Sequence, residues 1–377
     1  MRPFHRPVLA ALLVSAFMLG CRSGAPSPPS TSPPRAPADP GIYPDTAWTA
    51  IDDLAAAGLD PARFDTLRAR LAAEGTSAML VVVGGRVAFS YGDVARPTYL
   101  ASARKSVLSM LFGRYVEDGT VRLDATLADL AIDDTAGLLP VEHTATVGDL
   151  LTARSGVYHP AANQGDASAL APPRGSVRPG SYFLYNNWDF NALGEILERT
   201  TGEDLYVLLE RDLARPLGFE DWHREVQPRR NDTGASRYPA HHMVLSTRDM
   251  ARLGHLMLRG GRWRDAQVLP AAWVARTTRI ITPAAEVART SPFHPALGYG
   301  HLWWVVDPAA ARGPAWAGAY TATGAYGQYI TVLPALDVVV AHKVFAPPPP
   351  PPKQVREDAY LDRILPLVID AATPRTR

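Results

Sequence analysis

Apolar residues follow two different spacings along the chain. Runs typical of β-strands stand near the start of the folded part and again toward the end, at 78–83, 86–91, 298–306, 319–323, 328–333 and 336–344. The first two runs flank Gly84-Gly85, which predicts a hairpin with a glycine turn. Between the early and the late strands, the chain carries mainly helical spacing and loop signals.

Apolar residues recurring every three or four positions predict helices at 51–74, 102–117, 127–130, 146–156, 189–200, 203–213, 246–259 and 358–371. Residues 160–180 lack any period and read as a surface loop. The order predicts an α+β fold, in which the first and last strands form one antiparallel sheet flanked by the terminal helices. A mainly helical subdomain, roughly 118–290, would be inserted between them, and a cleft at the junction is the expected place for a site.

The first 46 residues differ from the remainder, 47–377, which we expect to be the folded domain. Residues 1–20 have a basic start and a short apolar run, as in a secretory signal peptide. Gly20-Cys21 resembles a bacterial lipoprotein cleavage box, which implies lipidation of Cys21 and a membrane anchor. An ordinary signal peptide or an uncleaved anchor is the alternative. Residues 21–46, rich in Pro, Ser and Ala, would form a tether, and we expect an envelope protein, facing the periplasm from the outer membrane.

Composition narrows the chemistry. The formal net charge is +1 and no basic stripe interleaved with aromatics is present, so nucleic-acid binding is not expected. A single cysteine can form neither an internal disulfide nor a multi-cysteine metal site. The chain has no His-Glu-x-x-His zinc motif, and no Gly-x-Ser-x-Gly of the α/β-hydrolases. We therefore expect neither a metal nor a cofactor. We expect the substrate to be a small molecule.

The strongest candidate chemistry lies in Ala101-Ser102-Ala103-Arg104-Lys105. Ser102 and Lys105 are three residues apart at the start of a predicted helix, so their side chains share one face. A serine is a poor nucleophile until a base takes its proton, and a lysine can do so only when neutral. Burial and the positive end of the helix dipole both favour the neutral amine. The alternative is an exposed helix with a solvated lysine.

Two further segments extend this pattern to one typical of a known superfamily. Tyr185-Asn186-Asn187 precedes a predicted helix, and Ala322-Thr323-Gly324-Ala325-Tyr326 lies at the end of a late strand. Together with Ser102-x-x-Lys105 these segments resemble the motifs of the serine β-lactamase and penicillin-binding-protein superfamily. The second segment matches the Tyr-x-Asn form of class C β-lactamases. The nearest resemblance is to family VIII esterases and 6-aminohexanoate-dimer-hydrolase-like proteins.

The resemblance implies roles for these residues. Ser102 would be the nucleophile, with Lys105 and Tyr185 sharing the proton transfers. Asn187 would hold Lys105 or a substrate amide, or simply cap the helix. The backbone N–H groups of Ser102 and Ala325 would form an oxyanion hole, with Gly324 allowing the strand to approach closely.

Further aromatic and histidine residues are candidates for the lining of the site. Tyr326, which follows the third motif, is a candidate substrate contact. Trp188, with Trp303 and Trp304, would form an apolar acyl-binding wall or pack in the core. His241 and His242 would line the cleft or lie elsewhere.

One departure from the family pattern bears on the substrate. The third motif usually begins with lysine, or histidine in some members, where this chain has Ala322. That change removes a cation for the carboxylate of β-lactams. We therefore expect a serine hydrolase of ester or amide bonds, with three alternatives kept open: a β-lactamase, a D,D-peptidase, or a non-catalytic module that binds an envelope ligand.

Overall fold

The computed structural model describes residues 41–165, 169–290, 293–345 and 353–373. The predicted signal peptide, Cys21, most of the predicted tether and the proline run 347–352 lie outside these residues. Within the described ranges, none of the helices combines the length and apolar composition that a membrane span requires.

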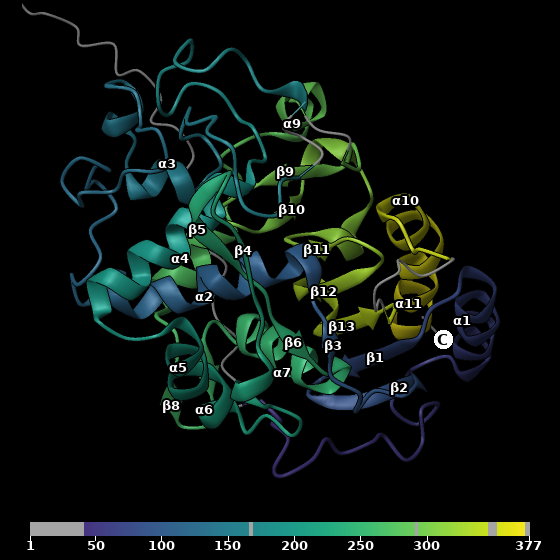
Figure 1. Cartoon of the computed structure of the whole chain (residues 1–377). Coiled ribbons are helices and arrows are strands. Elements are labelled where there is room, and N and C mark those ends of the chain that lie inside the picture. The colour runs from purple at the N-terminus through teal and green to yellow at the C-terminus, as the bar shows by residue number, and fades with distance from the viewer. Residues whose placement is uncertain (1–40, 166–168, 291–292, 346–352, 374–377) are drawn as a thin grey trace, which may run out of the picture. The chain divides into compact units, whose positions relative to one another are not determined.

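A seven-stranded antiparallel sheet organises the fold, in the order β2-β1-β13-β12-β11-β10-β9 (Figure 1). Its strands are β1 (Ala78–Val83), β2 (Arg86–Gly92), β9 (Leu297–Tyr299), β10 (Trp304–Val306), β11 (Tyr320–Gly324), β12 (Gln328–Leu333) and β13 (Val338–Lys343). The early hairpin joins the late strands where Val81 of β1 pairs with Val340 of β13. This confirms the predicted α+β fold, in which the first and last strands form one antiparallel sheet.

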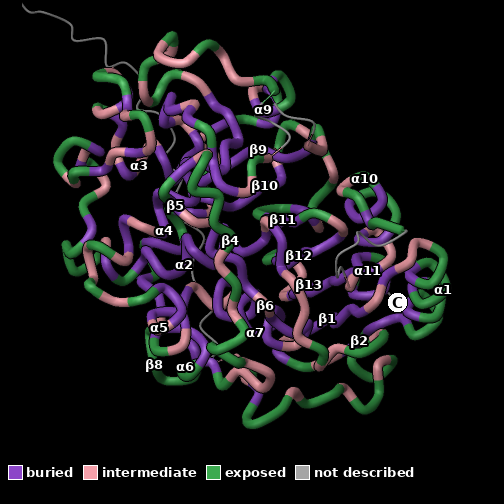
Figure 2. The backbone as a smooth tube through the Cα atoms, viewed as in Figure 1, coloured by how far each residue is buried: buried purple, intermediate pink, exposed green. Residues whose placement is uncertain are grey.

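Helices cover both faces of this sheet. Tyr360, in the helical turn before α11 (Leu365–Ala372), bonds to Thr331 of β12. α7 (Thr247–Leu258) packs on the sheet through Gly254, which lies against Ile330 and Val339. Because neighbouring strand residues point to opposite faces, Ile330 and Thr331 place α7 and the last helix on opposite sides. Figure 2 shows the central strands buried between these layers.

The two terminal helices pack against each other: α1 (Pro61–Glu74) contacts α11. The helix begins at Pro61 and not at residue 51, because the Asp60 side chain accepts hydrogen bonds from the backbone N–H groups of Ala62 and Arg63 and so caps it. The closing segment predicted at 358–371 is α10 (Glu357–Ala359), one wider π turn, and α11.

Residues between β2 and β9 hold most of the other helices. These are α2 (Arg104–Glu117), α3 (Val147–Leu151), α4 (Asn187–Thr201), α5 (Leu205–Leu209), α6 (Arg215–Leu217), α8 (Ala271–Thr277) and α9 (Ala284–Thr290). The same region also carries three short antiparallel pairs that the sequence did not predict: β3 (Thr98–Tyr99) with β6 (Val244–Leu245), β4 (Arg229–Asp232) with β5 (Ser236–His241), and β7 (Arg262–Trp263) with β8 (Ala266–Gln267). β4 is entirely polar, so it has no apolar alternation to reveal it.

Three further predicted elements differ from the structure in extent or type. Residues 127–130 form a turn, because Thr126 and Asp129 bond reciprocally and Ala131 then takes a left-handed backbone angle of 50°. The helix predicted at 146–156 ends at Leu151. The strand predicted at 298–306 is two strands, since Leu302 adopts φ of 62° and the chain reverses so that Trp304 pairs with Tyr299.

Candidate active site

The nucleophile candidate lies in a tight turn that leads into a buried helix. Ser102 is the middle residue of a 3-10 turn, Ala101–Ala103, and Lys105 is the second residue of α2. Ala101 adopts a left-handed φ of 48°, a strained conformation for alanine that is typical of functional sites. Hydrogen bonds from Ser106 to the Leu302 carbonyl and from Ser109 to the His301 carbonyl hold α2 in place.

The side-chain nitrogen of Lys105 meets three of the predicted site residues. Its Nζ lies 3.1 Å from Ser102 Oγ, 2.8 Å from the Tyr185 hydroxyl and 2.7 Å from Asn187 Oδ1. Tyr185 and Asn187 are 80 and 82 residues away in sequence. The fold therefore brings the alcohol, the amine and the phenol within hydrogen-bond reach of one another.

The orientation of Asn187 is set by its neighbours. Its Nδ2 donates to the Asn163 carbonyl at 2.6 Å, so Oδ1 is the atom that faces Lys105. The preceding residue, Asn186, caps α4 by accepting from the Trp188 N–H. Asn187 therefore does not cap the helix, and its side-chain oxygen binds Lys105.

Burial controls the protonation of this cluster. Lys105 is 1% exposed, and desolvation, together with the positive charge of Arg104, lowers its pKa well below the ordinary lysine value. The rings of Tyr185 and Phe190 lie 4.1 and 4.4 Å from Nζ and exclude water. Burial raises the pKa of the Tyr185 phenol above its usual range, with contact to Ser102 and the charge of Arg104 as smaller opposing effects. A neutral amine beside a neutral phenol is the favoured state.

The third motif approaches Ser102 from the sheet. A Cβ built on Gly324, the last residue of β11, would lie 2.7 Å from the Leu100 carbonyl oxygen and 3.0 Å from Ser102 N. No side chain fits that gap, so glycine allows the strand end to lie against the nucleophile turn. Ser102, Gly324, Ala325 and Tyr326 all line the same pocket, and Tyr326 has a left-handed φ of 71°.

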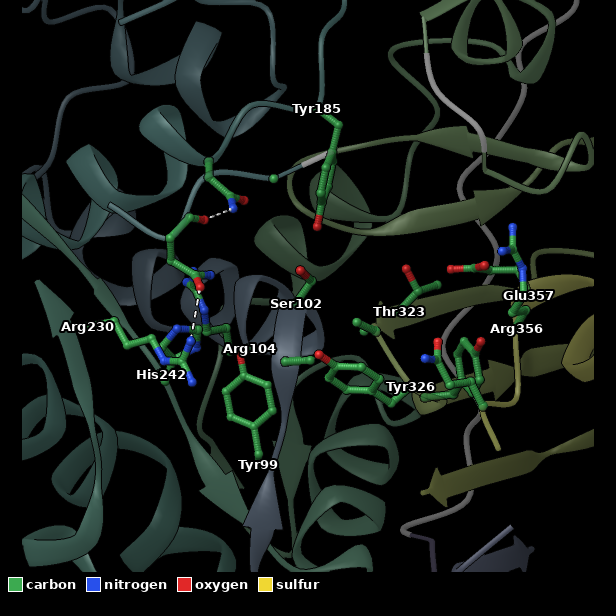
Figure 3. Close-up of a pocket in the computed structure, with 18 of the residues that line it drawn as sticks. Tyr99, Ser102, Arg104, Tyr185, Arg230, His242, Thr323, Tyr326, Arg356 and Glu357 are labelled. Carbon is green, nitrogen blue, oxygen red and sulfur yellow. Dashed lines mark hydrogen bonds between the residues drawn. The ribbon is translucent and has the colours of Figure 1, made fainter. Parts of the chain in front are cut away.

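The pocket itself has a volume of about 740 Å³, with Ser102 near its centre (Figure 3). Residues 163–165, in the predicted surface loop 160–180, and Phe293, between α9 and β9, also line it. Of the two adjacent histidines, His242 lines the pocket, whereas His241 points elsewhere and contacts Glu198 at 3.3 Å. Ala322 is fully buried in β11 and is not part of the lining.

Trp188 does not belong to the pocket surface, which corrects its assignment as a substrate contact. Its side chain is fully buried, and its indole N–H donates to Asp134 Oδ2 at 2.7 Å. Trp303 is likewise buried and absent from the lining, and Trp304 packs behind Tyr185 and Phe293. These tryptophans support the site through the core.

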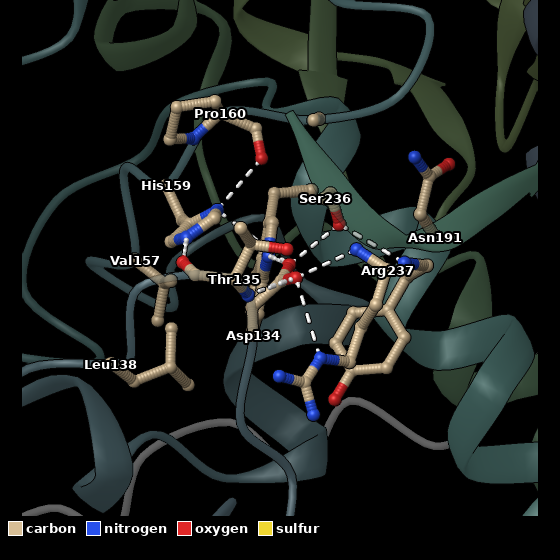
Figure 4. Close-up of polar contacts among 12 residues, drawn as sticks. Asp134, Thr135, Leu138, Val157, His159, Pro160, Asn191, Ser236 and Arg237 are labelled. Carbon is tan, nitrogen blue, oxygen red and sulfur yellow. Dashed lines mark hydrogen bonds and ion pairs between the residues drawn. The ribbon is translucent and has the colours of Figure 1, made fainter. Parts of the chain in front are cut away.

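Asp134 explains how the start of α4 is held. This carboxylate also accepts hydrogen bonds from the Ser236 hydroxyl and the backbone N–H groups of Thr135 and Arg237 (Figure 4). Burial alone would raise its pKa, but these donors outweigh burial and hold the pKa below its usual value. Because Trp188 directly follows Asn187, the Asp134 network fixes the residue that positions Lys105.

Several lining residues escaped the sequence analysis. Arg104, Tyr99, Arg230, Arg356 and Glu357 all line the pocket. Only Arg104 lies inside a motif that the sequence analysis singled out, between Ser102 and Lys105. Across the described ranges, no group of three His, Cys, Asp or Glu side chains could hold a metal ion.

Comparison with solved structures shows relatives of the same fold. EstCE1, described as a hydrolase with promiscuous acyltransferase activity, superposes with a TM-score of 0.59 at 18% identity, covering 85% of this chain and all of its own. A provisional 6-aminohexanoate-dimer hydrolase from Bacillus anthracis gives a TM-score of 0.59 at 19% identity, covering 88% of this chain and 89% of its own.

Curated sequences point in the same direction. Penicillin-binding protein 4 of Amycolatopsis lactamdurans is 25% identical over 74% of this chain and 82% of its own length. ML-236A carboxylate methylbutanoyltransferase of Penicillium citrinum is 27% identical over 39% of this chain, and the match spans only 44% of that relative. The family model described as Beta-lactamase matches residues 62–364, which include all three motifs and most of the chain. The chain therefore belongs to the Beta-lactamase family.

Proposed function

We propose that the protein is a serine hydrolase that cleaves an ester or amide bond through an acyl-enzyme on Ser102. The observation that carries this proposal is the position of Lys105 Nζ, within 2.7–3.1 Å of Asn187, Tyr185 and Ser102. A neutral amine has two N–H donors and one lone pair. Asn187 Oδ1 can only accept, and the Tyr185 oxygen accepts the second N–H, so the lone pair remains for the Ser102 proton.

This arrangement supports the following reaction. As Ser102 Oγ attacks the carbonyl carbon, its proton passes to Lys105, and the backbone N–H groups of Ser102 and Ala325 receive the developing oxyanion. The neutral Tyr185 phenol donates a proton to the leaving alcohol or amine and regains one from Lys105. Water then attacks the acyl-enzyme with the same base, releasing the acid and restoring Ser102.

The test is covalent labelling. A fluorophosphonate probe should add one label to the wild type at Ser102, and 4-nitrophenyl butyrate should be hydrolysed. Ser102→Ala should lose the label and turnover together, while Ser106→Ala, one helical turn further and bonded to Leu302, should keep the label. Labelling that persists in Ser102→Ala would remove Ser102 as the nucleophile.

Acyl transfer is a second candidate, favoured by the activities for which EstCE1 and the methylbutanoyltransferase of Penicillium citrinum are named. An alcohol would then replace water in the second step. Product analysis with added butanol separates the two, because transfer yields a butyl ester and hydrolysis yields the free acid. A β-lactamase activity is disfavoured because the buried Ala322 supplies no cation on the β11 side of Ser102, where the resemblance places the carboxylate of a β-lactam, so nitrocefin should not be turned over at ordinary enzyme rates.

We further propose that the domain is anchored in the cell envelope through a lipid on Cys21. Support comes from the sequence of residues 1–46. Radiolabelled palmitate should be incorporated into the wild type and not into Cys21→Ala. Absence of label in both, with the protein free in the periplasm, would indicate an ordinary signal peptide.

A further inference from the structure

Arg104, which lies between the two catalytic candidates in sequence, has an unusual environment. It is 2% exposed, it begins α2, and it lines the pocket. Its guanidinium makes no ion pair or hydrogen bond with any side chain or carbonyl in the described ranges, and Nε is wholly buried without a partner. A buried cation without a counter-charge is costly, so this position costs stability in the free protein.

The same side of the pocket carries further donors. Figure 3 shows Arg104, Arg230 and His242 gathered on one side of Ser102, with Arg356 and Glu357 on the other. Arg230 is exposed at this side and contacts Asn163 Oδ1 at 3.5 Å. His242 is 1% exposed, and neither of its ring nitrogens has a partner in the part of the chain that the structure describes.

The charges around His242 are all positive. Burial first, and then the guanidinium groups of Arg104 and Arg230, lower the pKa of His242 to about 2. The imidazole therefore stays neutral and keeps one N–H donor. Among the described lining residues, Glu357 is the sole carboxyl group, and it lies on the opposite side.

We propose that Arg104, Arg230 and His242 form a subsite for a carboxylate carried by the substrate. A carboxylate accepts up to about four hydrogen bonds and matches the planar fork of arginine. It would supply the counter-charge that Arg104 lacks and bring the scissile carbonyl to Ser102. This inference rests on the proposed hydrolase function and names its substrate class: anionic esters or amides.

Matched substrates test the subsite and locate the carboxylate. For a carboxylate in the acyl part, 4-nitrophenyl hydrogen glutarate is compared with neutral 4-nitrophenyl pentanoate. For one in the leaving group, 3-carboxyphenyl butyrate is compared with phenyl butyrate. In one of the two pairs, the wild type should hydrolyse the anionic ester with a kcat/KM about tenfold or more above that of the neutral ester. A ratio of that size is what one hydrogen bond to a charged group contributes.

Variants then assign the preference to Arg104. Arg104→Met should reduce the anionic-to-neutral ratio to about one, and Arg104→Lys should keep part of it because only the fork is lost. Arg356→Met is the matched control, since Arg356 lines the opposite side, and it should keep the wild-type ratio. A wild type without any preference, or a preference that survives Arg104→Met, would overturn the proposal.

A binding measurement separates this inference from the proposed function. In the Ser102→Ala background, glutarate should raise the unfolding temperature, whereas uncharged glutaramide should not. Adding Arg104→Met should abolish the glutarate effect while the ligand-free protein remains at least as stable, because an unpaired buried charge is removed. Failure of all esters to react, with the glutarate effect intact, would reject the hydrolase and retain the subsite. A glutarate effect that persists without Arg104 would reject the subsite.

Discussion

On a solvated helix, Lys105 would be an ordinary cation. In this protein its surroundings favour the neutral amine, which can act as a base. Burial removes the water that would stabilise its charge, and Arg104 adds a like charge nearby. Asn187 offers a neutral oxygen, which orients the amine without favouring protonation. Lys105 and Tyr185 are 2.8 Å apart and titrate as a coupled pair.

This environment predicts a specific pH dependence. For an uncharged ester, kcat/KM should rise with pH, because the protonated amine cannot accept the Ser102 proton. The midpoint should lie below about 10.4, the value of a free lysine. Asn187→Asp places a carboxylate beside Nζ, so it should move the midpoint to higher pH and lower activity at pH 7 by about 10- to 100-fold.

Asn187→Ala is the control for this substitution. It removes the same hydrogen bond without adding charge, so its midpoint should not rise. Equal midpoints for the two variants, measured with one neutral ester, would show that Lys105 is not the group whose ionisation limits the rate.

At the scale of elements, the site depends on how closely β11 approaches the turn before α2. Gly324 of β11 is 222 residues from Ser102 (324 − 102), and it meets the turn at backbone atoms of Leu100, Ser102 and Ala103. The three atoms nearest to a Cβ on Gly324 are all backbone atoms of this turn, so the contact cannot be relieved by rotating a side chain.

Gly324→Ala should therefore damage catalysis through displacement of the strand. The added methyl group would stand 2.7–3.0 Å from three backbone atoms, so β11 must move away from Ser102. Since the oxyanion donors would separate, kcat should fall by about 10²-fold or more. Gly234→Ala is the matched control: its nearest neighbour would be Asp232 Oδ1 at 3.6 Å, an ordinary contact. Comparable losses of kcat in the two variants would contradict this explanation.

At the scale of the whole molecule, the closing segment ties the end of the chain to the strands that carry the site. Tyr360 stacks on Tyr329 with ring centroids 3.9 Å apart, and its hydroxyl bonds Thr331 at 2.8 Å. Tyr329 in turn lines the pocket and donates to the Val355 carbonyl. Strand β12 and the closing segment thus form this wall of the pocket together.

Removing the Tyr360 ring should loosen this closure. Tyr360→Ala should lower the free energy of unfolding by about 3–5 kcal/mol, the usual cost of emptying a buried aromatic site. Tyr360→Phe keeps the ring and loses one hydrogen bond, so it should cost about 1 kcal/mol, since Thr331 still bonds Thr321. Chemical denaturation measures both, and equal losses would mean that the hydroxyl matters more than the ring.

The sequence was enough to predict the early hairpin, the antiparallel sheet and a Ser102–Lys105 pair on one helix face, since these follow from spacings of two to four residues. The resemblance to a known superfamily added Tyr185, Asn187 and Gly324, which no local spacing connects to Ser102. Tertiary packing decided the remainder. It buried Trp188 on Asp134, left Arg104 in the pocket without a counter-charge, and lowered the pKa of Lys105. Burial and contacts between residues 54 or more positions apart depend on how the helices and the sheet pack together, and the spacing of apolar residues along the chain does not encode that packing.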